Sequence, residues 1–141
     1  RQRQMCIRDS TLIGSCDFSI QGGSVDAAFI SITNFSIVPN NGNLTGEEYN
    51  IWAGDNVTKL GETIAQSEGY ITSTNANVNA DGIYYTDMGE ATYLSAFGDS
   101  GGPVYLTDSK KVIGIHKGST AFTSIFVKVD NIASKLNAHF N

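Results

Sequence analysis

A single serine flanked by glycines lies within residues 98–104, where the chain reads Gly-Asp-Ser-Gly-Gly-Pro-Val. Because glycine has no Cβ, these glycines accept backbone conformations in which a tight turn points several N–H groups into one pocket. A serine that attacks an acyl carbon needs such N–H groups, since they stabilise the oxygen that becomes negative. The segment predicts a tight turn with Ser100 as a candidate nucleophile. The alternative is an ordinary glycine-rich turn with an aspartate before it.

The residues after the serine distinguish between two folds that use such a turn. The spacing Gly98-x-Ser100-x-Gly102 also fits the nucleophile elbow of α/β-hydrolases, which requires a helix after the serine. Here two apolar stretches, residues 103–106 and 112–115, are separated by a polar run. This pattern predicts a strand, a turn and a second strand, so the α/β-hydrolase alternative is excluded.

The composition is that of a β-rich domain. Of the 141 residues, 40% are hydrophobic, 16% are charged and 15 are glycine, which argues against disorder and against a coiled coil. Short apolar stretches follow one another closely, as is typical of a β-barrel or sandwich. The predicted strands cover residues 25–32, 49–53, 57–60, 62–64, 69–74, 76–78, 83–86, 102–106, 111–116 and 123–128.

The C-terminal residues depart from this β pattern. Ile132, Leu136 and Phe140 recur every four residues, which predicts a helix with one apolar face. Asp130 is the expected N-cap, because its carboxylate can accept a hydrogen bond from a free N–H of the first turn. His139 is then expected in the last turn, where the helix dipole favours a cation.

Several stretches of the chain resemble chymotrypsin-like serine proteases, and in particular the streptogrisin and glutamyl endopeptidase type. They are the serine turn at 98–104 and residues 17–30, 57–63 and 69–76. The resemblance covers most of the chain from about Asp17 onward. It implies an all-β fold of two Greek-key β-barrels of chymotrypsin type, with the first barrel incomplete, followed by a C-terminal helix.

Composition, turn pattern and the resemblance together predict a division of the chain. Residues 1–10 hold three of the nine Lys and Arg residues and lack apolar alternation, so we expect them to be a non-native leader. The expected parts after this leader are the remainder of the first barrel (11–38), a linker (39–48), the second barrel (49–128) and the helix (129–141).

On this resemblance Ser100 is the nucleophile, and the backbone N–H groups of Gly98 and Ser100 form the oxyanion hole. Asp26, near the start of an apolar stretch, would be the acid that orients the base; the alternative is an acid in solvent at a strand entrance. Where many members place a serine that supports this acid, the chain has Lys117. Asp26 is therefore either supported differently or not the triad acid.

The general base is missing from the sequence. A serine hydroxyl needs a neighbouring histidine to take its proton, and in the chymotrypsin order this histidine comes before the acid and the serine. The two histidines of the chain, His116 and His139, both follow Ser100. We therefore expect part of a serine endopeptidase that lacks the start of its first barrel and is inactive alone. The competing hypothesis is a non-catalytic, protease-like binding module.

Asp99 needs a cation or several donors if its carboxylate turns into the protein, away from the oxyanion hole. Streptogrisin-like proteases carry a basic residue early in the second barrel, at a position that Lys59 resembles. We expect an ion pair between Lys59 and Asp99, which would make N-terminal processing unnecessary. The alternative is a lysine in solvent on its strand.

His116 lies where the resemblance implies one wall of the primary specificity pocket, in a Gly-x-His motif like that of glutamyl endopeptidases. An imidazole there can donate a hydrogen bond to a carboxylate or amide oxygen, and Ser95 and Ser119 could supply hydroxyl donors to the same group. We expect cleavage after Glu, with Gln or Asp weaker. The alternatives are a core histidine bonded to backbone, and a preference for small apolar side chains.

The sequence disfavours several other classes of partner. The net charge of −5 provides no basic face for nucleic acid, and no apolar run reaches the length of a membrane span. The expected partner is a polypeptide substrate, and the expected chemistry needs neither metal nor cofactor. The resemblance implies a secreted monomer.

Overall fold

The computed structural model describes residues 13–34, 36 and 43–140. The expected leader, residues 1–10, lies outside the described residues, and so do residues 39–42 of the expected linker. The described elements are the strands β1 (Gly14–Gly22), β2 (Val25–Ile32), β3 (Asn56–Leu60), β4 (Gln66–Ala80), β5 (Ile83–Ala91), β6 (Pro103–Leu106), β7 (Val112–Ser119) and β8 (Ser124–Lys128), and the helix α1 (Val129–Leu136).

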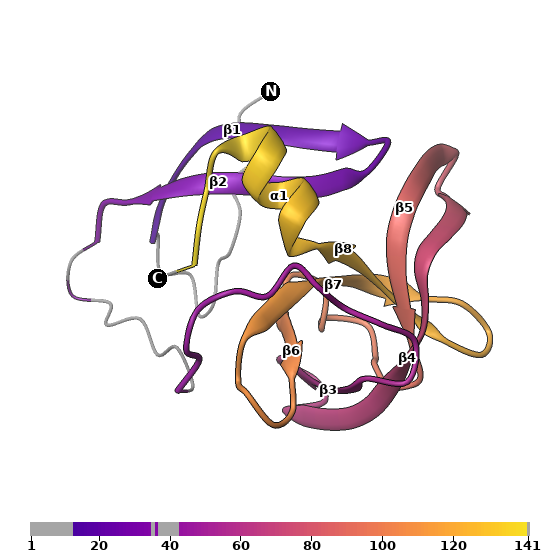
Figure 1. Ribbon diagram of the computed structural model, residues 1–141. Helices are drawn as coiled ribbons and strands as arrows, with labels where there is room; N and C mark the ends of the chain where they lie inside the picture. Colours follow the sequence, from indigo (N-terminus) through magenta and orange to yellow (C-terminus); the bar gives the residue numbers. More distant parts are fainter. Residues whose placement is uncertain (1–12, 35, 37–42, 141) are drawn as a thin grey trace.

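Strands β3 to β8 form a closed antiparallel barrel in the order β3-β4-β5-β8-β7-β6. The barrel closes because β3 pairs with β4 along one edge and with β6 along the other. β1 and β2 form a separate two-stranded hairpin, which lies beside the barrel with α1 against it (Figure 1). Closure leaves no free edge in the barrel, whereas within the described residues each strand of the hairpin has one edge outside the β1–β2 ladder.

The barrel interior is filled by apolar side chains from strands that are distant in sequence. They are Val57, Ile71, Ala91, Tyr93, Val104, Ile113 and Phe126, each nearly or fully buried. Gly89 makes room for one of the aromatic members, because a Cβ at this position would collide with the ring of Phe126. A glycine within β5 is thus required by packing.

A second apolar cluster joins the barrel to the hairpin and the helix. Its buried members are Tyr85, Met88, Ile125, Val127, Ile132 and Leu136, and Ile20 and Ala27 of the hairpin pack against it. The hairpin turn is also held by backbone bonds: Gly23 N donates to Tyr84 O at 3.2 Å, and Thr86 N donates to Gly23 O at 2.8 Å. The hairpin therefore presents one face to the barrel and the other to solvent.

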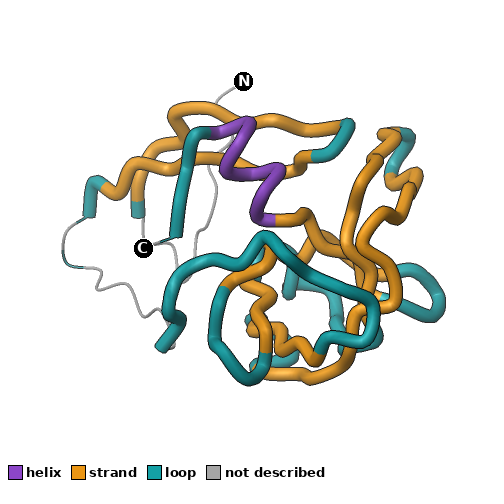
Figure 2. The backbone as a smooth tube through the Cα atoms, in the orientation of Figure 1, coloured by secondary structure: helices purple, strands orange, loops and turns teal. Residues whose placement is uncertain are grey.

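The segment of residues 43–55 runs across the barrel without forming a strand (Figure 2). The strand predicted at 49–53 is wrong, because Asp55 closes a turn there. Its carboxylate accepts from Trp52 N at 2.8 Å, and its own N–H donates to Trp52 O at 3.1 Å. Of this stretch Ile51 packs against the barrel core, while Trp52 is mostly exposed.

Two further strand predictions need correction. Residues 62–64 form a bend rather than a strand, because the amides of Thr63 and Ile64 donate to the carboxylate of Asp99 instead of to a neighbouring strand. The stretches predicted at 69–74 and 76–78 belong to one long strand, β4, which β-bulges bend as it pairs with β5. A bulge adds a residue without ending a strand, so the break in apolar pattern was misread.

The C-terminal helix is shorter than the prediction. It ends at Leu136, because Asn137 takes a left-handed conformation with φ of 49°, a common helix stop. Asp130 is not the N-cap: Lys128 occupies that position without a side-chain bond, and Asp130 lies in the first turn. His139 lies beyond the helix and contacts Glu47, with Nδ1 at 2.9 Å from Oε1.

Candidate active site

The serine turn is anchored on β7 by a pair of backbone hydrogen bonds. Gly101 N donates to His116 O, and His116 N donates to Gly102 O, both at 2.8 Å. Gly98 and Gly101 have positive φ values of 102° and 94°, which glycine adopts without strain. This turn therefore needs its glycines and is held rigidly at its C-terminal side.

The amides of the turn divide into two groups. Asp99 N donates to Ala96 O and Gly102 N donates to Asp99 O, each at 3.1 Å, so these groups close the turn. In the described part of the chain no backbone–backbone bond uses the amides of Gly98 and Ser100. These two are the amides that the sequence predicted as oxyanion donors, and both residues lie at the surface.

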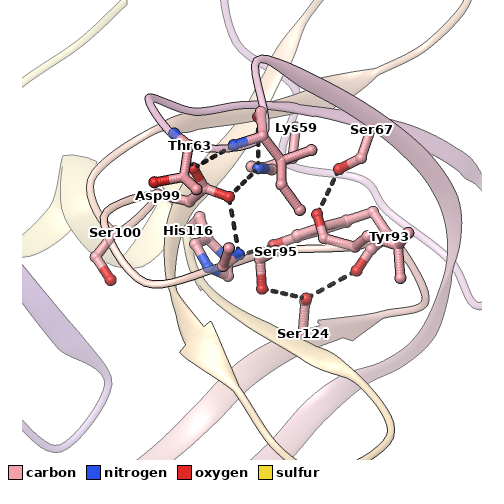
Figure 3. Close-up of polar contacts among 12 residues, drawn as sticks. Lys59, Thr63, Ser67, Tyr93, Ser95, Asp99, Ser100, His116 and Ser124 are labelled. Atoms are coloured by element: carbon pink, nitrogen blue, oxygen red, sulfur yellow. Dashed lines mark hydrogen bonds and ion pairs between the residues drawn. The ribbon is translucent and has the colours of Figure 1, made fainter.

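Asp99 turns its side chain away from Ser100 and into the barrel (Figure 3). Its Oδ2 accepts from Lys59 Nζ at 2.6 Å and from Ala96 N at 2.9 Å, and both charged side chains are fully buried. Oδ1 accepts from Thr63 N at 2.7 Å and from Ile64 N at 3.0 Å. The carboxylate thus receives four hydrogen bonds.

Burial alone would raise the pKa of Asp99, but the hydrogen bonds from Lys59 and three backbone amides hold this pKa well below its usual range. Asp99 is therefore ionised at any ordinary pH. Gly61 allows the pair to form, because a Cβ there would collide with the Asp99 carboxylate and approach the Lys59 ammonium. The geometry has Lys59 joined to Asp99, the two residues that the sequence predicted as an ion pair.

Ser100 makes a contact on the opposite side of the turn. Its Oγ donates to the backbone carbonyl of Lys117 at 2.8 Å. The Lys117 side chain bonds to Asp26, which also accepts a hydrogen bond from the Tyr85 hydroxyl at 3.3 Å. The Lys117 ammonium lies over the Tyr85 ring, 4.0 Å from its centroid. Asp26 is therefore supported by a lysine and a tyrosine.

Ser100 and Asp26 line a common cleft of about 590 Å³ between the hairpin and the barrel. Strands β1 and β2 form one wall, while Gly101, Ile115 and Lys117 lie on the other. Although burial opposes the charged form, the contact with Asp26 raises the pKa of Lys117, so its ammonium is not a base at neutral pH. Among the described residues no cluster of His, Cys, Asp and Glu could hold a metal ion.

Neither histidine of the chain reaches Ser100. His116 lies on β7 with its ring turned into the barrel, where Nδ1 is 3.0 Å from the Tyr93 hydroxyl. The two rings meet edge-on with centroids 5.5 Å apart. Burial, reinforced by the charge of Lys59, lowers the pKa of His116 to about 4. His116 is therefore neutral near pH 7.

The two predicted serine donors differ in their surroundings. Ser95 Oγ is 3.0 Å from Ser124 Oγ, and Ser124 Oγ in turn donates to Tyr93 O at 2.8 Å. Because Ser124 uses its proton on Tyr93, the Ser95 proton points to Ser124. Ser119 ends β7 at the position that pairs with Ser124 in the ladder, and its side chain is exposed.

Three contributors to this site were absent from the sequence prediction. Tyr93 is buried against His116, Ser124 is buried against Tyr93, and Tyr85 supports Asp26. Tyrosines and serines are too common for their types to mark a site. The available signal was weak: Tyr85 and Tyr93 each lie in or directly after an apolar strand, and buried tyrosine hydroxyls normally need a partner.

Comparison with known proteins assigns the family. The family model described as trypsin matches residues 31–136. The chain belongs to the trypsin family. Within this family it is 31% identical over 118 residues to glutamyl endopeptidase 2 of Streptomyces griseus, in a match that covers 81% of this chain. The chain spans 58% of the length of that relative.

Solved structures show the same fold. A glutamic acid specific serine protease that utilizes a novel histidine triad in substrate binding superposes with a TM-score of 0.76 at 23% identity, covering 94% of this chain and 76% of that protein. Protease A of Thermobifida fusca superposes with a TM-score of 0.75 at 26% identity, covering 88% of this chain and 72% of that protein. The predicted all-β chymotrypsin fold is confirmed. None of the described helices is long and apolar enough to cross a membrane.

Proposed function

We propose that this chain carries the nucleophile, the oxyanion hole and the primary specificity pocket of a secreted, monomeric serine endopeptidase that cleaves after Glu. Ser100 attacks the scissile carbonyl, and the amides of Gly98 and Ser100 stabilise the oxyanion. Asp26 orients an imidazole that lies between it and Ser100. The substrate is a polypeptide, and the reaction passes through an acyl-enzyme.

One observation carries this proposal: the Asp99 carboxylate points inward and is held by Lys59 and three amides. That arrangement fixes the backbone from Gly98 to Ser100 in the conformation with a positive φ at Gly98. Two amides are then left for a substrate oxygen. A turn with no catalytic role has no need of a buried ion pair beneath it, because burying charge is unfavourable unless every group is satisfied.

The proposed preference for Glu rests on His116, which lies on β7 next to the serine turn. His116 is buried with Nδ1 on Tyr93, and among the described residues its Nε2 makes no hydrogen bond; we propose that a substrate side chain takes this place. A buried donor that stays unpaired is costly, so such a pocket rejects substrates without an acceptor. The similarity to glutamyl endopeptidase 2 points the same way.

Among the residues that the structure describes, no group is placed to take the proton of Ser100. That proton is held by Lys117 O, His116 is bonded to Tyr93, and His139 contacts Glu47. We therefore propose that the chain by itself has only residual activity. An imidazole from outside these residues would enter the cleft next to Asp26.

The decisive test is hydrolysis of a peptide library that varies the residue before the scissile bond. It should be run with the 141-residue chain, with the chain plus free imidazole, and with any longer form of the protein. We expect residual turnover by the chain and an increase with imidazole, or with the longer form. Turnover should be fastest after Glu and disappear in Ser100→Ala.

Two outcomes would overturn the proposal. Rapid hydrolysis by the chain alone that is lost in Ser100→Ala would show that a group within it acts as base. Faster cleavage after Leu, Phe or Ala than after Glu, with a profile unchanged in His116→Val, would refute the pocket. If no form of the protein with an imidazole hydrolyses any peptide, the competing hypothesis of a binding module replaces the enzyme.

A further inference from the structure

His116 is held at one nitrogen only. The Tyr93 hydroxyl lies 3.0 Å from Nδ1, and both side chains are about 2% exposed. In a neutral imidazole one nitrogen carries the proton and the other accepts, so a fixed partner at Nδ1 selects between two tautomers. We propose that Tyr93 is the positioning residue that fixes His116 with its proton on Nε2, facing the substrate side chain. This deepens the proposed function and relies on it for the nature of the substrate.

The proton count favours this tautomer. The Tyr93 hydroxyl keeps its proton, because burial raises its pKa far above the ordinary value. Among the described residues its only hydrogen-bond contact is His116 Nδ1. If the hydroxyl donates, Nδ1 accepts and Nε2 is the protonated nitrogen. In the reverse arrangement the hydroxyl proton would lack an acceptor inside the barrel, which is unfavourable for a buried group.

The backbone of Tyr93 is held at its carbonyl and at its amide, as a positioning residue requires. Ser124 Oγ donates to its carbonyl at 2.8 Å, and Gly69 packs closely against its amide. The ring meets His116 edge-on, so the hydroxyl cannot swing away without displacing the barrel core. These contacts come from β4, β7 and β8, and together they hold the tyrosine at a single distance from the imidazole.

The other histidine of the chain, His139, cannot take the place of Tyr93 as the partner of His116. The chain holds two histidines, and His139 lies next to Glu47. The glutamic acid specific protease of the same fold utilizes a histidine triad in substrate binding, which two separated histidines cannot form. A tyrosine partner leaves His116 neutral, so the pocket offers an N–H donor without a positive charge. Glu and Gln both provide an oxygen that accepts such a bond.

The tautomer can be read directly by NMR. Long-range ¹H–¹⁵N spectra distinguish protonated from unprotonated imidazole nitrogens, and His139→Gln assigns the two histidines. In the 141-residue chain we expect Nδ1 of His116 to be unprotonated and Nε2 protonated, without change between about pH 5.5 and 8. Tyr93→Phe should move these resonances toward a mixture of tautomers. Tyr105→Phe, which alters another buried tyrosine, should leave them unchanged.

A second measurement tests the consequence for recognition. Peptides that end in Glu, Gln or Leu are titrated onto the chain and its variants. Tyr93→Phe is expected to reduce the Glu-to-Leu affinity ratio about tenfold, and in the parent chain Gln is expected to bind more weakly than Glu but more tightly than Leu. Tyr105→Phe should preserve the ratio. A spectrum with Nδ1 protonated, or a Tyr93→Phe variant with unchanged spectrum and ratio, would overturn the inference.

The two proposals fail in different ways. If His116→Val leaves the Glu-to-Leu ratio unchanged, the proposed specificity is wrong even where the tautomer is as stated. If His116→Val abolishes the ratio but Tyr93→Phe changes neither ratio nor spectrum, the pocket stands and the role of Tyr93 is refuted.

Discussion

Two ion pairs flank Ser100, and they differ in how completely protein surrounds them. Lys59 and Asp99 lie inside the barrel, where neither side chain is exposed. Lys117 and Asp26 lie in the cleft between barrel and hairpin, with side chains 15% and 29% exposed. The first pair joins strand β3 to the loop before β6 within one closed barrel, while the second joins β7 of the barrel to β2 of the hairpin.

This difference separates two tasks. The buried pair fixes the backbone of the serine turn, and four hydrogen bonds to one carboxylate leave it a single arrangement. The cleft pair has fewer partners and contacts solvent, so water can replace either side chain. We expect rigidity on the oxyanion side of Ser100 and adaptability on the side that must receive a base.

Loss of one charge from the buried pair should have the largest effect. Asp99→Asn leaves the Lys59 ammonium without a counter-charge inside the barrel, which typically costs about 3–5 kcal/mol. Urea unfolding should show this decrease, and the residual activity should disappear with the oxyanion hole. If the variant does not fold, Asp99→Asn combined with Lys59→Met should recover part of the stability, because no buried charge then remains.

The exposed pair of Lys111 and Glu48, 3.3 Å apart, provides the matched control. Lys111→Met should change stability by no more than about 1 kcal/mol. An Asp99→Asn variant that is as stable as Lys111→Met would contradict the importance of the buried pair.

On the side of the proposed oxyanion hole, the sequence located most of the residues that meet in the structure. The turn around Gly98 and Ser100 follows from a local motif, whereas the contact of Lys59 with Asp99 was expected only from the resemblance to streptogrisin-like proteases. The bend at 62–64 did not follow, because its amides serve a carboxylate 35 residues away. No local pattern of apolar residues encodes such a partner, and the stretch was mistaken for a strand.

The second largest effect is expected from acid, which should destabilise the barrel through the buried His116. The pKa of His116 is about 4 in the folded chain because burial disfavours its charged form and Lys59 repels it, whereas an unfolded histidine has a pKa of about 6.5. Between these values the unfolded state binds more protons, so stability decreases as pH falls through this window. The expected loss is roughly 2–3 kcal/mol by pH 4. The stability that the ionised Asp99 provides is complete above the pKa of an unfolded aspartate, about 3.9. It is lost only as the pH falls below that value, so Asp99 does not add to the slope in this window.

Unfolding curves between pH 7.5 and 4.5 check this expectation. His116→Gln should remove most of the slope across the window, and His139→Gln should retain it. An unchanged slope in His116→Gln would mean that other groups cause the acid sensitivity.

The cleft pair should respond more weakly. Lys117→Met removes the ammonium from Asp26, which keeps the Tyr85 hydroxyl and gains water. We expect stability to change by no more than about 1 kcal/mol. Imidazole-dependent hydrolysis should increase, because an added imidazole no longer competes with Lys117 for the carboxylate. Lys135→Met, at an exposed lysine of α1, is the control. A decrease in imidazole-dependent rate would show that Lys117 supports Asp26 productively.

The cleft side was harder to predict from the sequence. Asp26 was proposed from a resemblance, but Lys117 and Tyr85 meet it from strands 91 and 59 residues away. His139 was assigned to a helix end that the left-handed Asn137 terminates earlier. In each case tertiary contacts decided the position of a side chain that local periodicity could not locate.

The smallest effect is expected on the hairpin itself. Phe18 and Phe29 are paired across β1 and β2 and stack with centroids 5.4 Å apart on its solvent face. A cross-strand aromatic pair contributes about 0.5–1 kcal/mol, so Phe29→Ser should weaken the hairpin by this amount. Amide hydrogen exchange should accelerate in β1 and β2 and remain unchanged in β3 to β8. Phe122→Ser, at an almost fully exposed site between β7 and β8, should alter neither group of strands.

Because the barrel closes without the hairpin, the hairpin and the barrel are expected to open separately. Equal acceleration in all strands would instead mean that hairpin and barrel unfold as one unit, and that the cleft is as rigid as the oxyanion side.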